Sequence, residues 1–326
     1  MGAILAPAQG VVQGFEKEIQ GIFDRTKDCV VRIKTIVPVR DAEKGTVLAE
    51  GLSVGTGFFI DGQGTILTAS SVLNGADKAM VYWRGKTYEA QTVGQDPRTR
   101  VAMLKIEAKT PFLTTSDAEI KIGSMALAVG YPYEGPISTE YGFISDPNAT
   151  RMPQLFAITH IRSSVRVQPD QRGSPFLNSK GEVVGMVILA TRDDSSTFAI
   201  PIAATRRIQK DFLEHHAAMP GWTGLTIELR SDKLSAEDTI AIRGVYQGQP
   251  GHLAGVRSGD VLQKIGEKPI RTAADVMNAT FYLSVGDTVN FTVERDGEAL
   301  SLPVKITTRP SEKELLALKL VEPTRP

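Results

Sequence analysis

Cysteine and histidine are scarce in this chain. Cys29 is the single cysteine among 326 residues, and only four histidines occur. One cysteine can form neither an intrachain disulfide nor a cysteine-based metal site. No cluster of His, Cys, Asp or Glu stands at metal-ligand spacing, which disfavours a metal- or ligand-binding module. We therefore expect no metal and no cofactor.

Long apolar runs and long basic runs are also absent. No apolar segment reaches the ~20 residues that cross a bilayer, so we expect no transmembrane segment. The first fifteen residues have neither the basic start nor the full apolar core of a signal peptide. The 37 Lys and Arg balance the 37 Asp and Glu, giving a formal net charge of zero. This balance argues against nucleic acid as the main partner.

What the sequence does contain is typical of a folded, strand-rich protein. At roughly 100–200 residues per domain, the length indicates two or three domains. Residues 13–28 space four apolar side chains at helical intervals, which predicts a short helix within an N-terminal segment, 1–28. These side chains are Phe15, Ile19, Ile22 and Phe23. Short β-branched segments with turn signals at about ten-residue intervals then fill residues 29–217, a pattern typical of an all-β barrel or sandwich.

A second unit follows the Pro220-Gly221 breaker. Residues 221–308 mix several strand patterns with one helical pattern over 273–283, for which Thr272 is a plausible N-cap and Asp275 suits the helix dipole. The helical pattern that closes the first unit covers residues 201–216. Residues 309–326 form a C-terminal tail, which we expect to be frayed or packed on the domain; the alternative is one or two helical turns that carry Leu315, Leu316, Leu318 and Leu320.

Three segments of the first unit carry a family resemblance. They read GTGFFIDGQGTILTASSVL, DPRTRVAMLKI and VQPDQRGSPFLNSKGEVVGMV. In this order and at these separations they resemble the HtrA/Deg family, and GQPGHLAGVRSGDVLQKIGEKPI resembles its PDZ domain. The resemblance covers roughly residues 15–308. It implies a mainly β fold, with a trypsin-like double β-barrel over 29–217 and one α+β PDZ domain over 221–308.

The resemblance also identifies the triad positions. Where the family has its His, Asp and Ser, this chain has Ser71, Arg100 and Arg172. The glycine of the family's oxyanion loop is replaced by Asp170, which precedes Gln171. A triad needs a nucleophile, a base and an acid that orients the base. We therefore expect a pseudoprotease, not an enzyme, that acts as a peptide-binding scaffold or regulator.

Alternatives remain open at this point. The chain could be an active serine-type endopeptidase of the family with unorthodox catalytic residues, such as a relocated Ser174–His160 dyad, for which the sequence gives little support. His160 is expected to be a partly exposed strand residue and Ser174 a turn residue. Arg100 and Arg172 could make the cleft bind anions or carboxylates, or they could be drifted positions that are solvated or paired locally.

The resemblance implies recognition of protein C-termini or extended peptides by the PDZ domain. Its peptide-binding residues would be Trp222, Thr223, Gly224, Leu225 and Ile227 of the loop and strand, with Val276, Met277 and Thr280 of the helix. The alternative is a plugged groove that serves as a spacer. The resemblance further implies a homo- or hetero-oligomer, such as a trimer with HtrA-like subunits, and a periplasmic or otherwise extracytoplasmic location.

Overall fold

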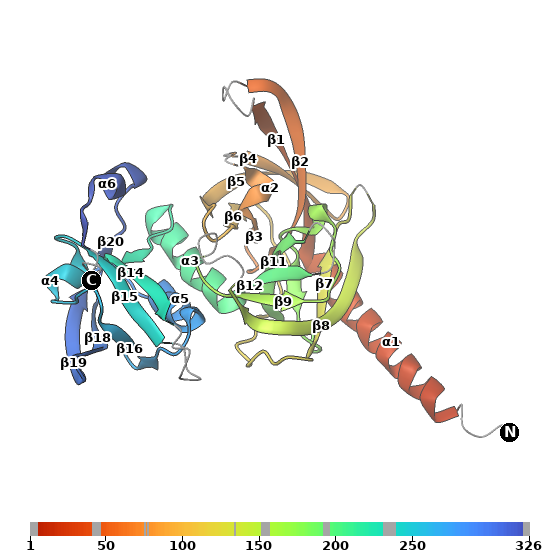
Figure 1. Ribbon diagram of the computed structural model, residues 1–326. Helices are drawn as coiled ribbons and strands as arrows, with labels where there is room; N and C mark the ends of the chain where they lie inside the picture. The colour runs from red at the N-terminus through yellow and green to blue at the C-terminus, as the bar shows by residue number, and fades with distance from the viewer. Residues whose placement is uncertain are drawn as a thin grey trace. The chain divides into compact units, whose positions relative to one another are not determined.

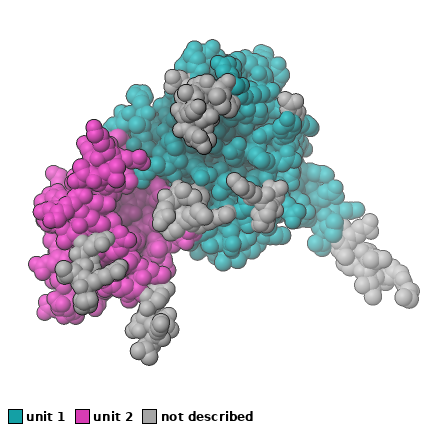
Figure 2. All heavy atoms as spheres, turned by 45° about the horizontal axis from the view of Figure 1, so that its top comes forward, with its two compact units in different colours: residues 1–149, 160–218 teal, residues 150–159, 219–326 magenta. Residues whose placement is uncertain are grey.

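The chain folds into two compact units. The computed structural model describes residues 6–40, 47–74, 76, 78–133, 135–150, 157–191, 196–230 and 239–321. Residues 1–149 and 160–218 form the first unit, and residues 150–159 and 219–326 form the second (Figure 2).

A helix opens the first unit. Helix α1 (Ala6–Thr26) and the 3-10 turn η1 (Lys27–Cys29) precede the first strand. The prediction of a short helix within 13–28 is wrong in length, because α1 starts at Ala6. Pro7 lies in its first turn, where proline's missing N–H costs no helical hydrogen bond. The N-terminal half of α1 extends away from the barrels (Figure 1), while Ile22 near its end is fully buried.

Six strands of the first unit close into a barrel in the order β1-β2-β3-β6-β5-β4. Buried and exposed residues alternate along β4, as expected for a strand with one face toward a barrel interior. Ala79, Val81 and Trp83 point inward, and the residues between them face out. The bounds are β1 (Val30–Arg40), β2 (Val47–Phe59), β3 (Thr65–Ala69), β4 (Lys78–Trp83), β5 (Lys86–Asp96) and β6 (Val101–Lys105), with helix α2 (Ser70–Leu73) after β3.

A second six-stranded barrel follows in the order β10-β11-β12-β9-β8-β7. Its strands are β7 (Met125–Gly130), β8 (Ser138–Ala149), β9 (His160–Ser163), β10 (Pro175–Leu177), β11 (Val183–Ala190) and β12 (Thr197–Pro201). The 3-10 turn η2 (Pro169–Gln171) precedes β10. The predicted closing helix is confirmed as α3 (Ile202–His215), whose Phe212 is buried against Gly94.

The second unit is an antiparallel sheet with helices. Its main sheet has the path β14-β15-β16-β18-β19, with β17 on β16 and β21 on β15, and β13 pairs β20 separately. The strands are β13 (Gly221–Trp222), β14 (Leu225–Arg230), β15 (Thr239–Tyr246), β16 (Val261–Ile265), β17 (Lys268–Pro269), β18 (Thr288–Arg295), β19 (Glu298–Lys305), β20 (Thr307–Thr308) and β21 (Leu320–Val321). The helices are α4 (Pro250–Leu253), α5 (Ala273–Phe281) and α6 (Glu312–Ala317).

The predicted N-cap of α5 is confirmed. Thr272 is its N-cap, and the Thr272 hydroxyl accepts a hydrogen bond from the Asp275 N–H at 3.2 Å while the Asp275 carboxylate accepts from the Thr272 N–H at 2.9 Å. This reciprocal pair satisfies two backbone donors that the helix leaves open. With the two barrels and this α+β unit, the predicted fold class is confirmed.

Candidate functional site

Three segments of the first unit converge where the resemblance places its triad. Ser71 lies in α2, Arg100 in the turn between β5 and β6, and Arg172 directly after η2. The Ser70 N–H donates to the Arg100 carbonyl at 2.9 Å, and the Thr56 N–H of β2 donates to the Arg172 carbonyl at 3.0 Å. These bonds bring the residues at positions 71, 100 and 172 into one region formed by both barrels.

Gly173 allows the close approach of these segments. Its φ of +87° lies in the left-handed region, and a Cβ added there would meet the Thr56 carbonyl oxygen at 2.0 Å and the Ala69 nitrogen at 2.9 Å. A side chain at this position would push the Arg172 segment away from β2 and α2.

The region is electropositive. Burial lowers the pKa of Arg100, and the nearby positive charge of Arg172 lowers it further. Arg100 also holds a left-handed backbone with φ of +61°, which is uncommon for a residue other than glycine, asparagine or aspartate. The Arg172 guanidinium donates from Nε to the Pro169 carbonyl at 2.7 Å.

One carboxylate lies among these cations. Burial raises the pKa of Asp170, and the positive charges of Arg172 and Arg32 oppose that rise. The Asp170 carbonyl accepts a hydrogen bond from the Thr56 hydroxyl at 3.2 Å, while Gln171 beside it is fully buried. Sequence reasoning missed Arg32, which reaches this region from β1 and gives no local signal of doing so.

Removing the Arg172 charge tests this arrangement. In Arg172→Ala, we expect the pKa of Asp170 to rise further, because the substitution removes the positive charge that lowers this pKa most. Carbon-detected NMR titration of the Asp170 carboxyl measures the change. Arg166→Ala, which removes an exposed arginine nearby in the sequence, is the matched control. An unchanged or lower pKa in Arg172→Ala would show that the two side chains do not interact.

The structure does not bring Ser174 and His160 together as a dyad. His160 begins β9 and Ser174 precedes β10, and these two strands lie on opposite sides of the closed barrel. The expectation that His160 is partly exposed is wrong, since it is 1% exposed. Strand β9 is hydrogen-bonded on both edges, to β8 and β12. Ser174 is fully buried, with its hydroxyl against Gly130.

The predicted peptide-binding loop lies at the start of β14. Trp222 is nearly buried and donates from Nε1 to the Gln249 Oε1 at 3.0 Å, so it fastens the loop to the segment before α4. Thr223 accepts at its carbonyl from the Gly251 N–H at 2.8 Å. Gly224 has φ of +70° and accepts at its carbonyl from the Tyr246 N–H at 2.9 Å. The loop is therefore held at three points.

The strand and helix beside this loop differ in accessibility. Leu225 and Ile227 of β14 are half-buried and pack against the core of the second unit. In α5, Met277 and Thr280 are half-exposed, whereas Val276 is buried in that core at 7% exposure. Val276 thus supports the helix rather than offering an accessible surface. Among the residues that the structure describes, no group of three His, Cys, Asp or Glu could hold a metal ion.

Comparison with known proteins gives two domain matches. The trypsin-like peptidase domain family matches residues 55–186, and the PDZ domain family matches residues 224–306. The chain is 31% identical over 295 residues to a probable periplasmic serine endoprotease, DegP-like, of Ectopseudomonas mendocina, covering 86% of this chain and 62% of that relative. A DegP-like protein of Chlamydia trachomatis is 28% identical over 278 residues, covering 81% and 56%. The chain spans about three fifths of the length of these relatives.

Solved structures agree on the fold. The HtrA-type protease AlgW with tripeptide superposes with a TM-score of 0.76 at 23% identity, covering 90% of this chain and 97% of that one. The serine endoprotease from Yersinia pestis superposes with a TM-score of 0.64 at 23% identity, covering 89% and 97%.

These comparisons correct one expectation and support another. The expectation that the chain is not an enzyme is contradicted, because its relatives are named serine endoproteases and its structural neighbours are HtrA-type proteases. The same relatives are named periplasmic, in agreement with the extracytoplasmic location expected from the resemblance. None of the helices that the structure describes is long and apolar enough to cross a membrane. With its trypsin-like peptidase domain, its PDZ domain and these relatives, the chain belongs to the HtrA/Deg family.

Proposed function

We propose that this chain is an extracytoplasmic serine-type endopeptidase of the HtrA family that captures protein C-termini or extended peptides through its PDZ unit. The observation that carries the proposal is the 31% identity, over 86% of the chain, to a relative named a probable periplasmic serine endoprotease. The proposed domain limits are 1–28, 29–217, 221–308 and 309–326.

Strand β14 supports the peptide-capture half of the proposal. It is the end strand of its sheet path and pairs with β15 on one side. PDZ domains bind an extended peptide as an added strand and hold its carboxylate with backbone N–H groups. Gly224 at the start of β14 has the left-handed backbone that helps a loop turn its amides toward an anion. AlgW structures with a tripeptide and a decapeptide have the same overall fold.

A substitution in α5 tests the proposed peptide capture. In Met277→Glu, a negative charge enters the helix face proposed to line the peptide-binding groove. We expect a labelled peptide with an apolar C-terminal residue to bind at least about tenfold more weakly, since burying an apolar side chain beside an unpaired carboxylate is unfavourable. Fluorescence anisotropy with the full chain measures the affinity.

Two controls complete this test. Leu316→Glu makes the same kind of change at a residue of the same unit that is 91% exposed, and it should leave binding unchanged. The same peptide with an amidated C-terminus should bind weakly to every variant. Equal affinity of wild type and Met277→Glu would refute the proposed groove.

For the hydrolytic half, we propose Ser71 as the nucleophile. The residue is half-buried, and its hydroxyl is buried without a hydrogen-bond partner among the described residues, so the side chain must rotate toward the cleft to reach a peptide. Its oxygen would add to the scissile carbonyl while its proton passes to water, and the positive charge at Arg100 and Arg172 would stabilise the oxyanion. Collapse of this intermediate would break the C–N bond, with the leaving amine taking a proton from water, and a second water would then hydrolyse the acyl-serine and restore Ser71. Ser174 is fully buried and cannot reach a peptide carbonyl without a rearrangement.

Such a site should be slow. Loss of triad members lowers kcat by about 10⁴–10⁶-fold in serine proteases, so we expect turnover far below that of a full triad. Hydrolysis of an unfolded protein that is lost in Ser71→Ala and kept in Ser174→Ala would support the assignment. Loss in Ser174→Ala alone would transfer the role to Ser174.

We also propose that the chain assembles with itself or with HtrA-like subunits, as a trimer. Exposed apolar residues on α1 support this: Val11 is 74% exposed, Val12 64% and Phe15 40%. Light scattering of the full chain gives the mass, and a monomer at micromolar concentration would contradict the proposal.

A further inference from the structure

A cationic groove runs along the outside of the first barrel. Its described walls enclose about 480 Å³ and carry four cations, which are Arg32, Lys34, Arg84 and Lys86. The opposite wall comes from the loop between β7 and β8, with Tyr131, Gly135 and Pro136. None of the described residues that line this groove is acidic.

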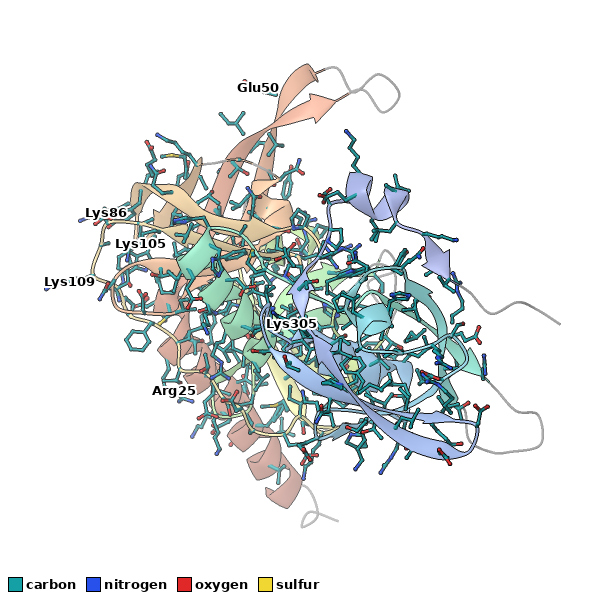
Figure 3. The ribbon with its side chains drawn as sticks, turned by 90° about the vertical axis from the view of Figure 1, so that its left-hand side faces the viewer. Arg25, Glu50, Lys86, Lys105, Lys109 and Lys305 are labelled. Atoms are coloured by element: carbon teal, nitrogen blue, oxygen red, sulfur yellow. The ribbon has the colours of Figure 1, made fainter. Side chains whose placement is uncertain are left out.

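Strand geometry turns two of these cations outward. Arg32 and Lys34 alternate along β1 with Val31, Ile33 and Thr35, which are buried. Arg32 lies opposite Tyr82 of β4 in the antiparallel register. The other two cations stand at the tip of the β4–β5 hairpin, and Lys86 extends outward from it (Figure 3).

Aromatic rings hold three of the cations in place. The Arg32 guanidinium lies 4.8 Å from the centre of the Tyr131 ring, and the Lys34 ammonium lies 5.3 Å from that of Tyr82. The Arg84 guanidinium lies 5.1 Å from the centre of the Trp83 ring. Contacts of this kind restrain long side chains without neutralising their charge, so the cations remain available to an anion.

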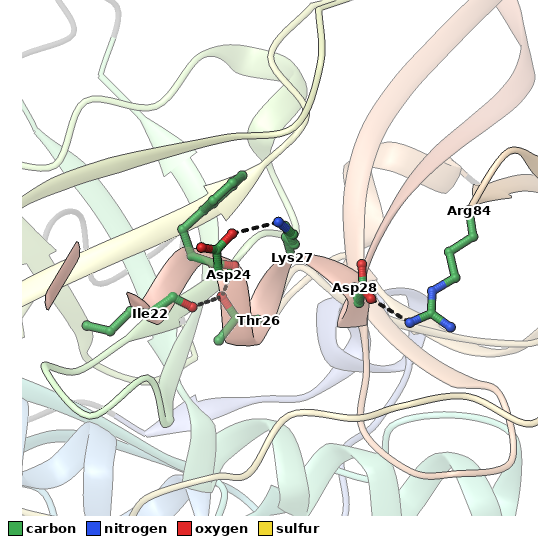
Figure 4. A network of polar contacts seen from close by, with 7 residues as sticks. Ile22, Asp24, Thr26, Lys27, Asp28 and Arg84 are labelled. Carbon is green, nitrogen blue, oxygen red and sulfur yellow. Dashed lines mark hydrogen bonds and ion pairs between the residues drawn. The ribbon is translucent and has the colours of Figure 1, made fainter. Parts of the chain in front are cut away.

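The cations are only partly neutralised by groups of the chain. Arg32 donates from Nη2 to the Gly135 carbonyl, and its Nε is buried without a partner among the described residues, out of reach of an anion in the groove. Arg84 pairs with Asp28 at the groove's rim (Figure 4), and its side chain is still 54% exposed. No ion pair of Arg32, Lys34 or Lys86 is found among the described residues.

The hairpin keeps its arginine at a conformational cost. Arg84 has φ of +47° and Gly85 has φ of +73° at the centre of a two-residue turn. Two-residue turns with positive φ at both positions favour Asn-Gly or Asp-Gly, so an arginine at the first position is unfavourable. Residues in such conformations cluster at functional sites, so this position favours a role for the arginine beyond forming the turn.

The groove adjoins the candidate active site. The Tyr131 N–H donates to the Thr56 hydroxyl at 3.0 Å, and that hydroxyl donates to the Asp170 carbonyl at 3.2 Å. A peptide lying in the cleft beside Asp170 could therefore continue along the groove past Tyr131.

We propose that this groove binds acidic segments of the peptides that the chain handles. This inference rests on the proposed function and names its substrate class as polypeptides with clustered Asp and Glu. The cations come from separate positions on β1 and the hairpin, which suits several spaced carboxylates better than a single compact anion. The aromatic rings add apolar surface for the peptide chain between its charges.

The test uses the full chain and a fluorescein-labelled peptide rich in Glu with an amidated C-terminus. The amide removes the carboxylate that the PDZ unit would hold. In Lys34→Gln/Lys86→Gln we expect anisotropy titrations to show affinity about fivefold to tenfold weaker, with a smaller dependence on salt. Lys180→Gln/Lys210→Gln removes the same charge from exposed positions outside the groove and should change affinity little.

A second variant separates binding from folding. Arg84→Asn replaces the arginine by a residue that suits the turn, so its melting temperature should stay equal or rise while acidic-peptide binding weakens. Equal binding by the wild type and both groove variants would overturn the proposal. The proposal would also be overturned if inorganic polyphosphate bound in a way that depends on Lys34 and Lys86 while the acidic peptide did not bind.

The outcomes also separate this proposal from the proposed function. A peptide with an apolar, free C-terminus and no acidic residues should bind Lys34→Gln/Lys86→Gln as it binds the wild type. If the peptide with the apolar, free C-terminus binds and the acidic peptide does not, the groove proposal is wrong, while the proposal that the PDZ unit captures peptides remains supported.

Discussion

A chain that carries Ser71→His, Arg100→Asp and Arg172→Ser together is expected to hydrolyse casein about 10³-fold faster than the wild type, or more. Triad members act as a unit, and their removal costs about 10⁴–10⁶-fold in kcat, so supplying all three should recover much of that difference. Initial rates with labelled casein at neutral pH measure the gain.

The backbone around the three positions favours this result. The Ser70–Arg100 bond and the Thr56–Arg172 bond already hold the segments together, and Gly173 keeps its left-handed turn. Aspartate accepts the φ of +61° at position 100 more readily than arginine does. Adding Asp170→Gly should raise the rate further, because it removes a negative charge from the loop where the family's oxyanion forms.

The control keeps Arg172 and carries only Ser71→His and Arg100→Asp. It has a base and its orienting acid but no serine at position 172, and it also lacks the Ser71 hydroxyl, so it should cleave no faster than Ser71→Ala. A triple variant that folds and shows no gain over this control would mean that positions 71, 100 and 172 are not the triad positions.

Asp260→Ala is expected to destabilise the PDZ unit by about 3–5 kcal/mol, out of a total stability of about 5–15 kcal/mol for a typical domain. The Asp260 side chain is 1% exposed. Its two oxygens accept from the Arg295 Nε and Nη2, each at 2.7 Å, and Oδ2 also accepts from the Arg257 N–H at 2.8 Å. Hydrogen bonding to Asp260 raises the pKa of Arg295. The substitution leaves the Arg257 N–H without its partner and the Arg295 guanidinium with only its bond to the Gly255 carbonyl, at 2.8 Å.

Hydrogen exchange of β16 and β18 in the full chain measures this loss. Glu294→Ala removes a neighbouring carboxylate whose bond to Gln263 is exposed, and it should change stability by no more than about 0.5 kcal/mol. Exchange of β16 and β18 in Asp260→Ala that matches the control would contradict a stabilising role for this ion pair.

Local features of the fold could be predicted from the sequence. The N-cap at Thr272 and the closing helix depend on residues within one or two turns, and both are confirmed. The start of α1 could not be predicted, because residues before 13 lack the apolar spacing on which the helix prediction depended. The burial of His160 depends on which strands flank β9, and that pairing is set by residues far away in the sequence.

In the candidate site, too, some features could be predicted from the sequence and others depend on the fold. The positions of Ser71, Arg100 and Arg172 could be proposed from motif resemblance, and the structure brings their segments together. Arg32 could not be connected with Asp170, because nothing near either residue in the sequence indicates that β1 passes the loop at 169–172. The cationic groove combines residues of β1, the β4–β5 hairpin and the β7–β8 loop, so it exists only in the folded chain.

Turnover by the wild-type chain tests whether Ser71 acts as a nucleophile. Wild type, Ser71→Ala and Ser174→Ala are purified in parallel and incubated for hours with a quenched fluorescent peptide and with unfolded casein, and the fragments are identified by mass spectrometry. We expect slow cleavage by wild type and Ser174→Ala, and none by Ser71→Ala. No cleavage by the folded wild type, or equal cleavage by all three, would contradict this expectation.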